Sequence, residues 1–507
     1  MTILILGDQL AFDHGPLLDR PDERILMIEA RSFAERFPYN PHKLTLAFSA
    51  MRHFRDALEA RGRRIEYRTV ESFDEGLNEH FAAFPDDELV LMRPSSFGAA
   101  DALRELVEAE GGTLEAVDNP LFLCSSAMFD DWRDGRVPPY RQEGFYRFMR
   151  RKTGYLMDGD DPVGGKWNYD KQNRQVPGEG HEPPAPPRFE PDDLTRSVRY
   201  WVRTEFDGDY DDHPYGGGWA DPDDFSWPVT RAQALVALEA FIEDRLAVFG
   251  PYQDAMMAGE WAMNHSLLAP ALNLGLLHPA EVIETAIAAA ADSEIPLNSL
   301  EGFVRQILGW REFMRHVYRT SMPDLAHANR LDATGELPAL YWTGQTEMAC
   351  LADALDSVRW RGYSHHIQRL MVLANFALLY GVEPSQLNRW FQAAYVDAFH
   401  WVTTPNVVEM GSYAAGEFAT KPYAASANYL DRMSDYCGDC RYDPDETTGE
   451  TACPFAALYW TFLDRHEDRL RGEGRMGLVY AHLADKAMGP IADRAETIRA
   501  AIDDGDL

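Results

Sequence analysis

The first 120 or so residues alternate short apolar runs with amphipathic stretches. The apolar runs predict strands at 2–7, 24–30, 64–70, 88–94 and 113–118, and the segments between them predict helices at 44–62, 75–84 and 99–110. Strands that alternate with helices are typical of a parallel sheet covered on both faces. We therefore expect a Rossmann-like α/β domain over 1–130. GDQL follows the first strand, so the dinucleotide fingerprint GxGxxG is missing.

The remaining chain changes character twice. Residues from about 157 to 229 are rich in Pro, Gly and Asp, with one possible helix near 195–206, which indicates a connector over 131–229. Thr230 is a plausible N-cap, and apolar residues then recur at spacings of three and four. Similar patterns continue to the end, so we expect a larger all-helical domain over 230–507.

Charge and hydropathy indicate the cellular environment in which the chain works. Asp and Glu outnumber Lys and Arg by 82 to 48, giving a formal net charge of −34. Such a surface repels DNA at low salt but is screened at molar salt, where the Debye length is about 3 Å. We interpret this as halophilic adaptation, with an ordinary acidic enzyme as the alternative. No apolar run approaches the roughly 20 residues of a membrane span, and Asp8 interrupts the apolar start, so we expect a cytoplasmic protein.

Three of the five cysteines crowd into one acidic loop. Their spacing is Cys437-x2-Cys440-x12-Cys453, and a fourth thiol could come from Cys124 or Cys350. Four thiolates can hold zinc in a tetrahedron or an iron–sulfur cluster. Disulfides are the alternative, although a reducing cytosol favours metal over disulfide.

Four stretches of the helical half carry polar residues within apolar helix patterns. They are NHSLLAPALNLGLL (264–277), EGFVRQILGWREFMRH (301–316), YSHHIQRLMVLANFALL (363–379) and YVDAFHWVTTPNV (395–407). In the third, His366 and Arg369 are three residues apart and share a face beside the apolar stripe. An Arg in such a helix is costly unless it is paired. Asp397, also set among apolar residues, is its natural partner.

These stretches, together with ILGDQL, FSAMRHF, FYRFMRRKTG, TKPYAAS and the cysteine loop, resemble the prokaryotic iron–sulfur photolyase/cryptochrome family. That family contains the bacterial (6-4) photolyases, and the resemblance covers nearly the whole chain. It implies the photolyase/cryptochrome architecture and a monomeric, light-driven flavoenzyme that repairs (6-4) photoproducts in UV-damaged DNA. The alternatives are a cryptochrome-like blue-light photoreceptor and a helical iron–sulfur nucleic-acid-binding protein without photochemistry.

The resemblance also implies three cofactors and their ligands. FAD would bind in the helical domain at Ser266, Leu267, Trp310, Arg311, Arg369, Asp397 and Thr403. A [4Fe–4S] cluster would bind Cys350, Cys437, Cys440 and Cys453, which leaves Cys124 as a buried thiol. A 6,7-dimethyl-8-ribityllumazine antenna would contact Gly7, Asp8, Gln9 and Glu29.

Catalytic roles follow from the same resemblance. His366, with His365 beside it, would donate and retrieve a proton, a role that suits an unperturbed pKa near 6.5. The aromatic residues expected near the lesion are Tyr423 and Tyr429. Trp342 and Trp390 would carry electrons inward, with simple core packing as the alternative. Two positions depart from the family: Thr403 stands where relatives place Asn, Asp or Glu, and Phe391 stands where a relative has Tyr.

Overall fold

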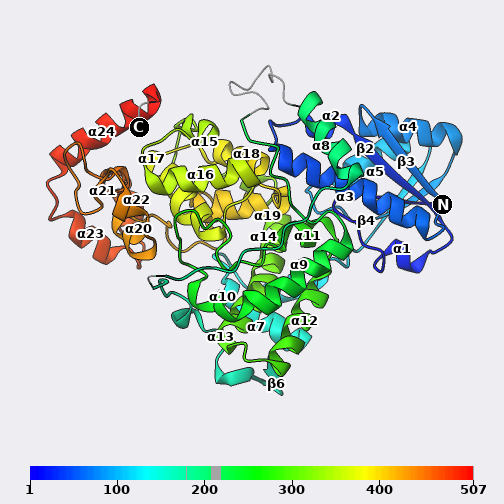
Figure 1. The fold of residues 1–507 in the computed structure, drawn as a ribbon, viewed down its shortest axis with the longest axis horizontal. Coiled ribbons are helices and arrows are strands. Elements are labelled where there is room, and N and C mark those ends of the chain that lie inside the picture. The colour runs from blue at the N-terminus through cyan, green and yellow to red at the C-terminus, as the bar shows by residue number, and fades with distance from the viewer. Residues whose placement is uncertain (179, 207–218, 506–507) are drawn as a thin grey trace.

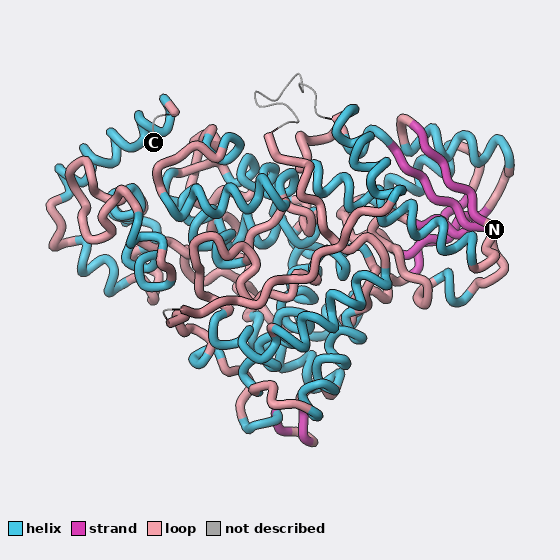
Figure 2. The backbone as a smooth tube through the Cα atoms, in the orientation of Figure 1, coloured by secondary structure: helices cyan, strands magenta, loops and turns pink. Residues whose placement is uncertain are grey.

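The computed structural model describes residues 1–178, 180–206 and 219–505; part of the Pro/Gly/Asp-rich stretch predicted as connector therefore lies outside the described residues. A five-stranded parallel sheet lies at the N-terminal end of the molecule, and helices form most of the rest (Figure 2). Its strands are β1 (Thr2–Ile5), β2 (Arg24–Ala30), β3 (Ile65–Val70), β4 (Glu88–Met92) and β5 (Thr113–Val117). The helices among them are α1 (Pro16–Asp19), α2 (Arg31–Ala34), α3 (Pro41–Ala60), α4 (Phe73–Ala83) and α5 (Ala99–Ala109). The predicted α/β fold is confirmed.

The sheet order is β3-β2-β1-β4-β5, so the chain builds outward from β1 in one direction and then in the other. Ile3 pairs with Ile25 on β2 and with Val90 on β4, and all three side chains are buried. The topological switch point therefore lies between β1 and β4. In open parallel sheets, ligands bind outside the carboxyl ends of the strands at such a point.

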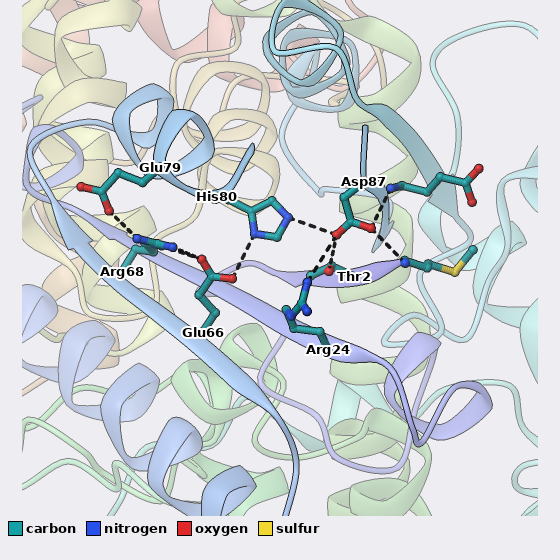
Figure 3. Close-up of polar contacts among 9 residues, drawn as sticks. Thr2, Arg24, Glu66, Arg68, Glu79, His80 and Asp87 are labelled. Carbon is teal, nitrogen blue, oxygen red and sulfur yellow. Dashed lines mark hydrogen bonds and ion pairs between the residues drawn. The ribbon is translucent and has the colours of Figure 1, made fainter. Parts of the chain in front are cut away.

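A buried histidine network closes the opposite, amino-terminal side of this sheet (Figure 3). His80 on α4 is fully buried, and its two ring nitrogens lie 3.1 Å from Glu66 Oε2 and 3.2 Å from Asp87 Oδ2. The Asp87 carboxylate also accepts the Thr2 hydroxyl at 2.6 Å and pairs with the amino terminus of Met1 at 2.9 Å. These contacts tie the first residues of β1 to β3 and to the turn before β4, which is a structural role.

The segment between the sheet and the helical half has few regular elements. These are α6 (Ser126–Arg133), α7 (Gln142–Thr153), the hairpin β6 (Met157–Asp158) and β7 (Asp161–Pro162), η1 (Val163–Gly165), η2 (Asp170–Gln172) and α8 (Asp193–Glu205). Helix α8 confirms the helix predicted within the connector, and it packs on α3. Arg150, in the basic run of α7, is 1% exposed and donates to the main-chain oxygens of Leu156 and Trp167. The Arg150 guanidinium therefore binds the main chain of the segment after α7 and does not face solvent.

The helical half begins where the sequence predicts. Thr230 caps α9 through a capping box with Gln233, which satisfies two otherwise unpaired N–H groups. Its first helices are α9 (Arg231–Asp244), α10 (Leu246–Tyr252), α11 (Ala269–Leu274), α12 (Pro279–Asp292), α13 (Leu297–Val304), η3 (Arg305–Arg311), α14 (Glu312–Ser321), η4 (Asp324–His327), α15 (Leu340–Thr343) and α16 (Ala349–Arg361). The remainder are η5 (Gln368–Ala374), α17 (Asn375–Tyr380), α18 (Pro384–Ala394), α19 (His400–Thr404), η6 (Pro405–Gly411), α20 (Ala427–Met433), η7 (Tyr436–Asp439), α21 (Pro454–Arg465), α22 (Glu467–Leu470), α23 (Gly477–Leu483) and α24 (Met488–Asp504).

Three of these elements, η3, η5 and η6, are π-helical. Wide turns of this kind recur at functional sites because they shift side chains out of the regular helical register. The predicted site residues Trp310 and Arg311 lie in the first, and Arg369 lies in the second. In the described part of the chain, no helix is long and apolar enough to cross a membrane. The domain bounds 1–130, 131–229 and 230–507 stay a prediction.

Helix α3 joins the sheet to the helical half (Figure 1). Asn40, its N-cap, donates through Nδ2 to the Val358 main-chain oxygen at 2.9 Å. The Lys43 ammonium donates to the main-chain oxygens of Gln392 and Ala398, and the latter distance is 2.7 Å. Burial lowers the pKa of Lys43 to about 7, although the nearby Asp397 carboxylate opposes that shift. The sheet is therefore locked directly onto the centre of the helical half.

Candidate functional site

A buried ion pair forms the centre of the site. Arg369 Nη1 and Nη2 donate to Asp397 Oδ1 and Oδ2 at 2.9 and 3.0 Å, a bidentate pair. Arg369 Nε donates to the Ser364 main-chain oxygen at 2.7 Å, and the guanidinium lies 4.1 Å above the Tyr395 ring. The pairing predicted from sequence is present, and every donor of the guanidinium is directed by a neighbour.

Three histidines converge beside this pair. The His265 ring stacks on that of His365 at 5.0 Å and meets the His366 ring edge-on, also at 5.0 Å. Their ligand nitrogens all lie within 4.8 Å of one another. Burial first, and then the neighbouring imidazoles, lower the pKa values of His265 and His365 well below the usual value. Both are therefore neutral at neutral pH.

His366 differs from the other two histidines in exposure and in partner. Its side chain is 49% exposed, and Nε2 lies 3.3 Å from Asp254 Oδ1. The Asp254 carboxylate adds to burial in raising the pKa of Tyr429 to about 12, so Tyr429 lies close by. The Arg174 charge acts on both Tyr429 and Tyr423. Asp254 thus links the exposed His366 to Tyr429, and Arg174 lies within electrostatic reach of both predicted lesion-side tyrosines.

A cavity of about 180 Å³ opens beside the histidines. It is lined by Ser266, Leu267 and Arg245, and by the rings of Trp227 and Trp261. The predicted phosphate-side residues Ser266 and Leu267 are therefore both cavity residues. Leu267 has a φ of 59°, a left-handed conformation that is uncommon for a non-glycine residue and recurs at ligand-binding sites.

Unsatisfied polar atoms surround this cavity. Arg245 is 1% exposed; its Nη1 donates to the His265 main-chain oxygen at 2.7 Å, and its Nε has no partner among the described residues. Burial lowers the pKa of Arg245 to about 10. Both amide atoms of Asn264 and Nε2 of His265 are also buried without a partner in the described chain. Because buried polar groups normally have partners, this set fits a polar ligand with negative charge.

The structure places three other predicted cofactor residues apart from this cavity. Arg311 Nη1 donates to the Leu121 main-chain oxygen at 3.1 Å, on the side facing the sheet. The Trp310 indole N–H donates to Asn406 Oδ1 at 3.0 Å. Thr403 is buried on α19. Among the described residues, no hydrogen bond, ion pair or ring contact joins any of the three to Ser266 or Arg369, and their cofactor roles stay predictions.

Aromatic rings lie in two contacting groups outward from the ion pair, joined by the main chain between Tyr341 and Trp342; together they are called the aromatic row. The Trp390 ring lies 5.8 Å from Tyr395 and 5.1 Å from Tyr341, and its indole N–H donates to the Tyr341 main-chain oxygen. Trp342 follows Tyr341 in sequence and meets the Trp219 ring edge-on at 5.2 Å. The two predicted electron-transfer tryptophans are thus linked through Tyr341, and Trp219 extends the row.

Four cysteines gather at the far end of the helical half. Cys350 lies in the first turn of α16 and Cys453 is the N-cap of α21. Cys437 lies within η7, and Cys440 is its C-cap. Burial raises the pKa of Cys350, and the other three thiols raise it further. All four sulfurs are therefore close to one another. Among the described residues, the histidine group is the one set of three or more possible metal ligands whose ligand atoms all lie within 4.8 Å of one another. The cysteine sulfurs are therefore spaced more widely than these nitrogens. Cys124 is buried in a separate part of the core.

The predicted antenna residues lie at the carboxyl edge of the sheet. Gly7, Asp8 and Gln9 follow β1 at the switch point, where Gln9 Nε2 donates to the Met92 main-chain oxygen at 2.7 Å. Gln9 Oε1 is buried and has no partner in the described chain. Burial raises the pKa of Asp8 to about 6, against the nearby Arg315 charge. Two polar groups therefore keep unused bonding capacity at this edge.

Glu29, the fourth predicted antenna residue, is already satisfied. Arg52 donates to both carboxylate oxygens at 3.0 and 2.6 Å, and the Tyr67 hydroxyl donates to one of them. A Cβ on Gly7 would lie 2.9 Å from Met51 Sδ, so methionine already occupies the space against that turn. A ligand at this edge would be met mainly by Asp8 and Gln9, with Glu29 holding the wall behind them.

The structure adds site residues that the sequence analysis did not select. They are Trp219, Arg245, Asp254, Asn264 and His265. Asn264 and His265 begin the quoted NHSLL stretch, so their signal was available in the sequence. Asp254 and Trp219 lie outside helices, where no periodicity indicates what a side chain contacts.

Comparisons with known proteins agree with this arrangement. A family model described as deoxyribodipyrimidine photo-lyase-related protein matches residues 3–214. The chain is 40% identical over 488 residues to a (6-4) photolyase of Agrobacterium fabrum, covering 94% of each protein. Its fold is similar to a bacterial class III photolyase from Agrobacterium tumefaciens (TM-score 0.60, 17% identity, 99% and 98% of the chains). It is also similar to a Synechocystis cryptochrome (TM-score 0.57, 14% identity, 85% and 86%).

The ion pair gives a direct stability prediction. Arg369→Leu leaves the Asp397 carboxylate buried without its partner, so the free energy of unfolding should fall by about 3–5 kcal/mol. Arg389→Leu is the matched control, because Arg389 is exposed and lies on α18 away from the site; its effect should be within about 0.5 kcal/mol. Denaturant titration of both variants measures the difference. Equal losses would show that the pair does not stabilise the fold.

Proposed function

The chain belongs to the bacterial (6-4) photolyase family, and from this premise we propose that it repairs (6-4) pyrimidine–pyrimidone photoproducts in UV-damaged DNA by light-driven electron transfer. The full-length match to a (6-4) photolyase carries the proposal. The accessible His366–Asp254 pair beside Tyr429 supports it, because this chemistry needs a positioned acid at the surface where DNA docks. Chromosomal DNA as the substrate also implies the cytoplasm.

FAD is the proposed flavin, and the cavity of about 180 Å³ beside the histidines would take its phosphate end. Ser266, Leu267 and the unpaired Arg245 Nε would meet its phosphates, and the Arg369–Asp397 pair would face its ring system. Bound reduced flavin would supply the light-driven electron for repair. The pair and the buried histidines exclude water there, so that any charge near them acts in a low dielectric.

His366 is the proposed proton donor. It is the member of the histidine group that is exposed to solvent and that pairs with a carboxylate in the described chain. His265 and His365, held neutral by burial, would orient the His366 ring by packing against it. His366 would donate its proton to the extruded lesion and recover it as the hydroxyl returns to its original base. Tyr423 and Tyr429 would pack against the lesion.

Local positive charge supports DNA binding despite the acidic surface. Arg174 and Arg432 act on Tyr429, and Arg174 and Arg475 act on Tyr423, so three guanidiniums border the proposed docking site. Phosphate contacts of this kind fix the position of the duplex without reading its sequence. The surface elsewhere repels DNA, which would confine binding to this region unless salt screens it.

We also propose two further cofactors. The four converging thiols support a [4Fe–4S] cluster over zinc, because thiolates on tetrahedral zinc lie about 3.8 Å apart for a Zn–S bond of about 2.3 Å. A ribityllumazine antenna would bind at the carboxyl edge of the sheet, where Asp8 and Gln9 Oε1 remain available.

Cofactor analysis of the purified protein tests this set. We expect FAD, a lumazine released on denaturation, and about four iron and four sulfide per chain. Cys350→Ser should lose the iron, whereas the control Cys124→Ser should retain it, because Cys124 lies in a separate part of the core. One zinc and no iron would contradict the cluster, and a flavin-only extract would contradict the antenna.

Photoreduction with an external donor tests the aromatic row. Trp342→Phe should slow flavin photoreduction while FAD stays bound, since phenylalanine does not carry the radical that a tryptophan hop requires. Trp219→Phe should have a smaller effect of the same sign if the row continues to that ring. Trp167→Phe is the control, because Trp167 packs against Arg150 away from the row. Equal rates in all three variants would mean that electrons enter elsewhere.

Light-dependent repair of a defined (6-4) oligonucleotide tests the catalytic assignment. His366→Asn should keep FAD, iron and photoreduction, yet slow repair by about 10²–10⁴-fold, the usual value of general acid–base help. His365→Asn should slow it less. The exposed His482→Asn on α23 is the control and should repair normally.

The same assay distinguishes repair from light sensing. Wild-type protein that photoreduces and binds the lesion without repairing it would be a cryptochrome-like photoreceptor. Repair by His366→Asn at the wild-type rate would refute the proton donor and leave the family assignment intact.

A further inference from the structure

A second cavity lies on the other side of the helical half. It measures about 320 Å³ and is enclosed by the segment before α15, the turn between α17 and α18, and helices α21 and α24. Helix α21 packs against both α17 and the C-terminal helix α24 (Figure 1). None of the residues that line it belongs to the flavin, cluster, antenna or lesion sites described above. Its volume is within the range of small-molecule pockets.

Two arginines without acidic partners face this cavity. Arg465 makes no hydrogen bond or ion pair with any residue that the structure describes. Arg499 donates from its two terminal nitrogens to the main-chain oxygens of Tyr380 and Leu379, which fixes its orientation without neutralising it. Burial, and then the Arg499 charge, lower the pKa of Arg465, so the two guanidiniums are close enough to repel each other. An anion between them would remove this repulsion.

Gly381 holds Arg465 in this position. The turn places Gly381 at a φ of 95°, which side chains other than glycine rarely adopt. A Cβ there would also lie 2.9 Å from Arg465 Nη1. The guanidinium therefore lies directly against the main chain at the cavity wall, where only glycine leaves room for it.

The acidic groups near the cavity are already engaged. Asp332 pairs with Arg469, and Asp503 accepts the Tyr380 hydroxyl. This is unexpected in a chain with 82 acidic and 48 basic residues, where most guanidiniums can find a carboxylate. His466, nearly buried in the wall, stays neutral because burial and then Arg465 and Arg469 lower its pKa to about 4. Asp332 lines the cavity but its carboxylate is bound to Arg469, and Asp503 acts on Arg499 from outside the lining. Within the described lining, the two guanidiniums therefore outnumber the single carboxylate.

We propose that this cavity binds the phosphate monoester of a small organic molecule. Two guanidiniums match the charge and the oxygen geometry of a phosphate dianion. The Thr334 and Ser412 side chains also line the cavity and can complete the phosphate shell. Leu331 and Leu378 line it as well, and they give the organic part an apolar wall. The proposal is independent of the function proposed above.

A pair of sugars that differ only in phosphate tests this site. Calorimetric titration of the FAD-loaded holoprotein with ribose 5-phosphate should show binding, and ribose should show none. Ribose phosphate is preferred to a nucleotide because a nucleotide could also enter the flavin site. Arg465→Gln should weaken binding about tenfold or more, the usual cost of one charge-assisted contact.

Arg471→Gln is the matched control. Arg471 is an exposed arginine six residues further along, paired with Glu467 and outside the cavity lining. It should bind ribose 5-phosphate as the wild type does, and flavin absorbance should be unchanged in both variants. Equal binding of ribose, or equal affinities of the Arg465→Gln and Arg471→Gln variants, would overturn the proposal. So would loss of duplex DNA affinity in Arg465→Gln without any binding of ribose 5-phosphate, because that result would assign Arg465 to the DNA backbone.

Discussion

The carboxylate of Asp397 is the constraint around which the helical half is organised. It is 9% exposed, and burying an ion without partners costs several kcal/mol. Arg369 on η5 binds both oxygens, Lys43 on α3 lies within electrostatic reach, and Asn273 on α11 donates to the Asp397 main-chain oxygen at 3.0 Å. Elements from the sheet region and from distant parts of the helical half must therefore meet at one point, or the charge is left uncompensated.

That single constraint also positions the chemistry around it. Arg369 can reach Asp397 only while its Nε holds the Ser364 carbonyl, and this fixes the backbone that carries the two following histidines. The guanidinium rests on the Tyr395 ring, whose other neighbour is Trp390, the first ring of the aromatic row. The proposed proton donor and the proposed electron path thus share one rigid support. Neither needs a flexible loop for its placement.

The sequence predicted the parts of this structure that depend on local pattern. All five strands of the main sheet, α8 and the Thr230 cap follow from periodicity and capping chemistry. The Arg369–Asp397 pair was predictable because a charge in an apolar helix needs a partner. Nothing local reveals that Asp254 meets His366 across 112 residues, or that Trp219 meets Trp342. The same limit applies to π-helical turns, which depend on tertiary packing and leave no periodic signal.

The need of each charge for a partner also explains the charge distribution over the whole chain. With a net charge of −34, most guanidiniums have a carboxylate within reach, and such pairs add little stability at the surface. Positive charge that stays free of a close carboxylate partner is therefore informative about ligands. It occurs at Arg245 in the flavin cavity and at Arg465 and Arg499 in the second cavity. In an acidic protein, a guanidinium stays free of a carboxylate when burial or main-chain contacts hold it, and when the nearby acids are bound elsewhere. Asp224 in the first cavity pairs with Arg188 and Arg361, and Asp332 in the second pairs with Arg469.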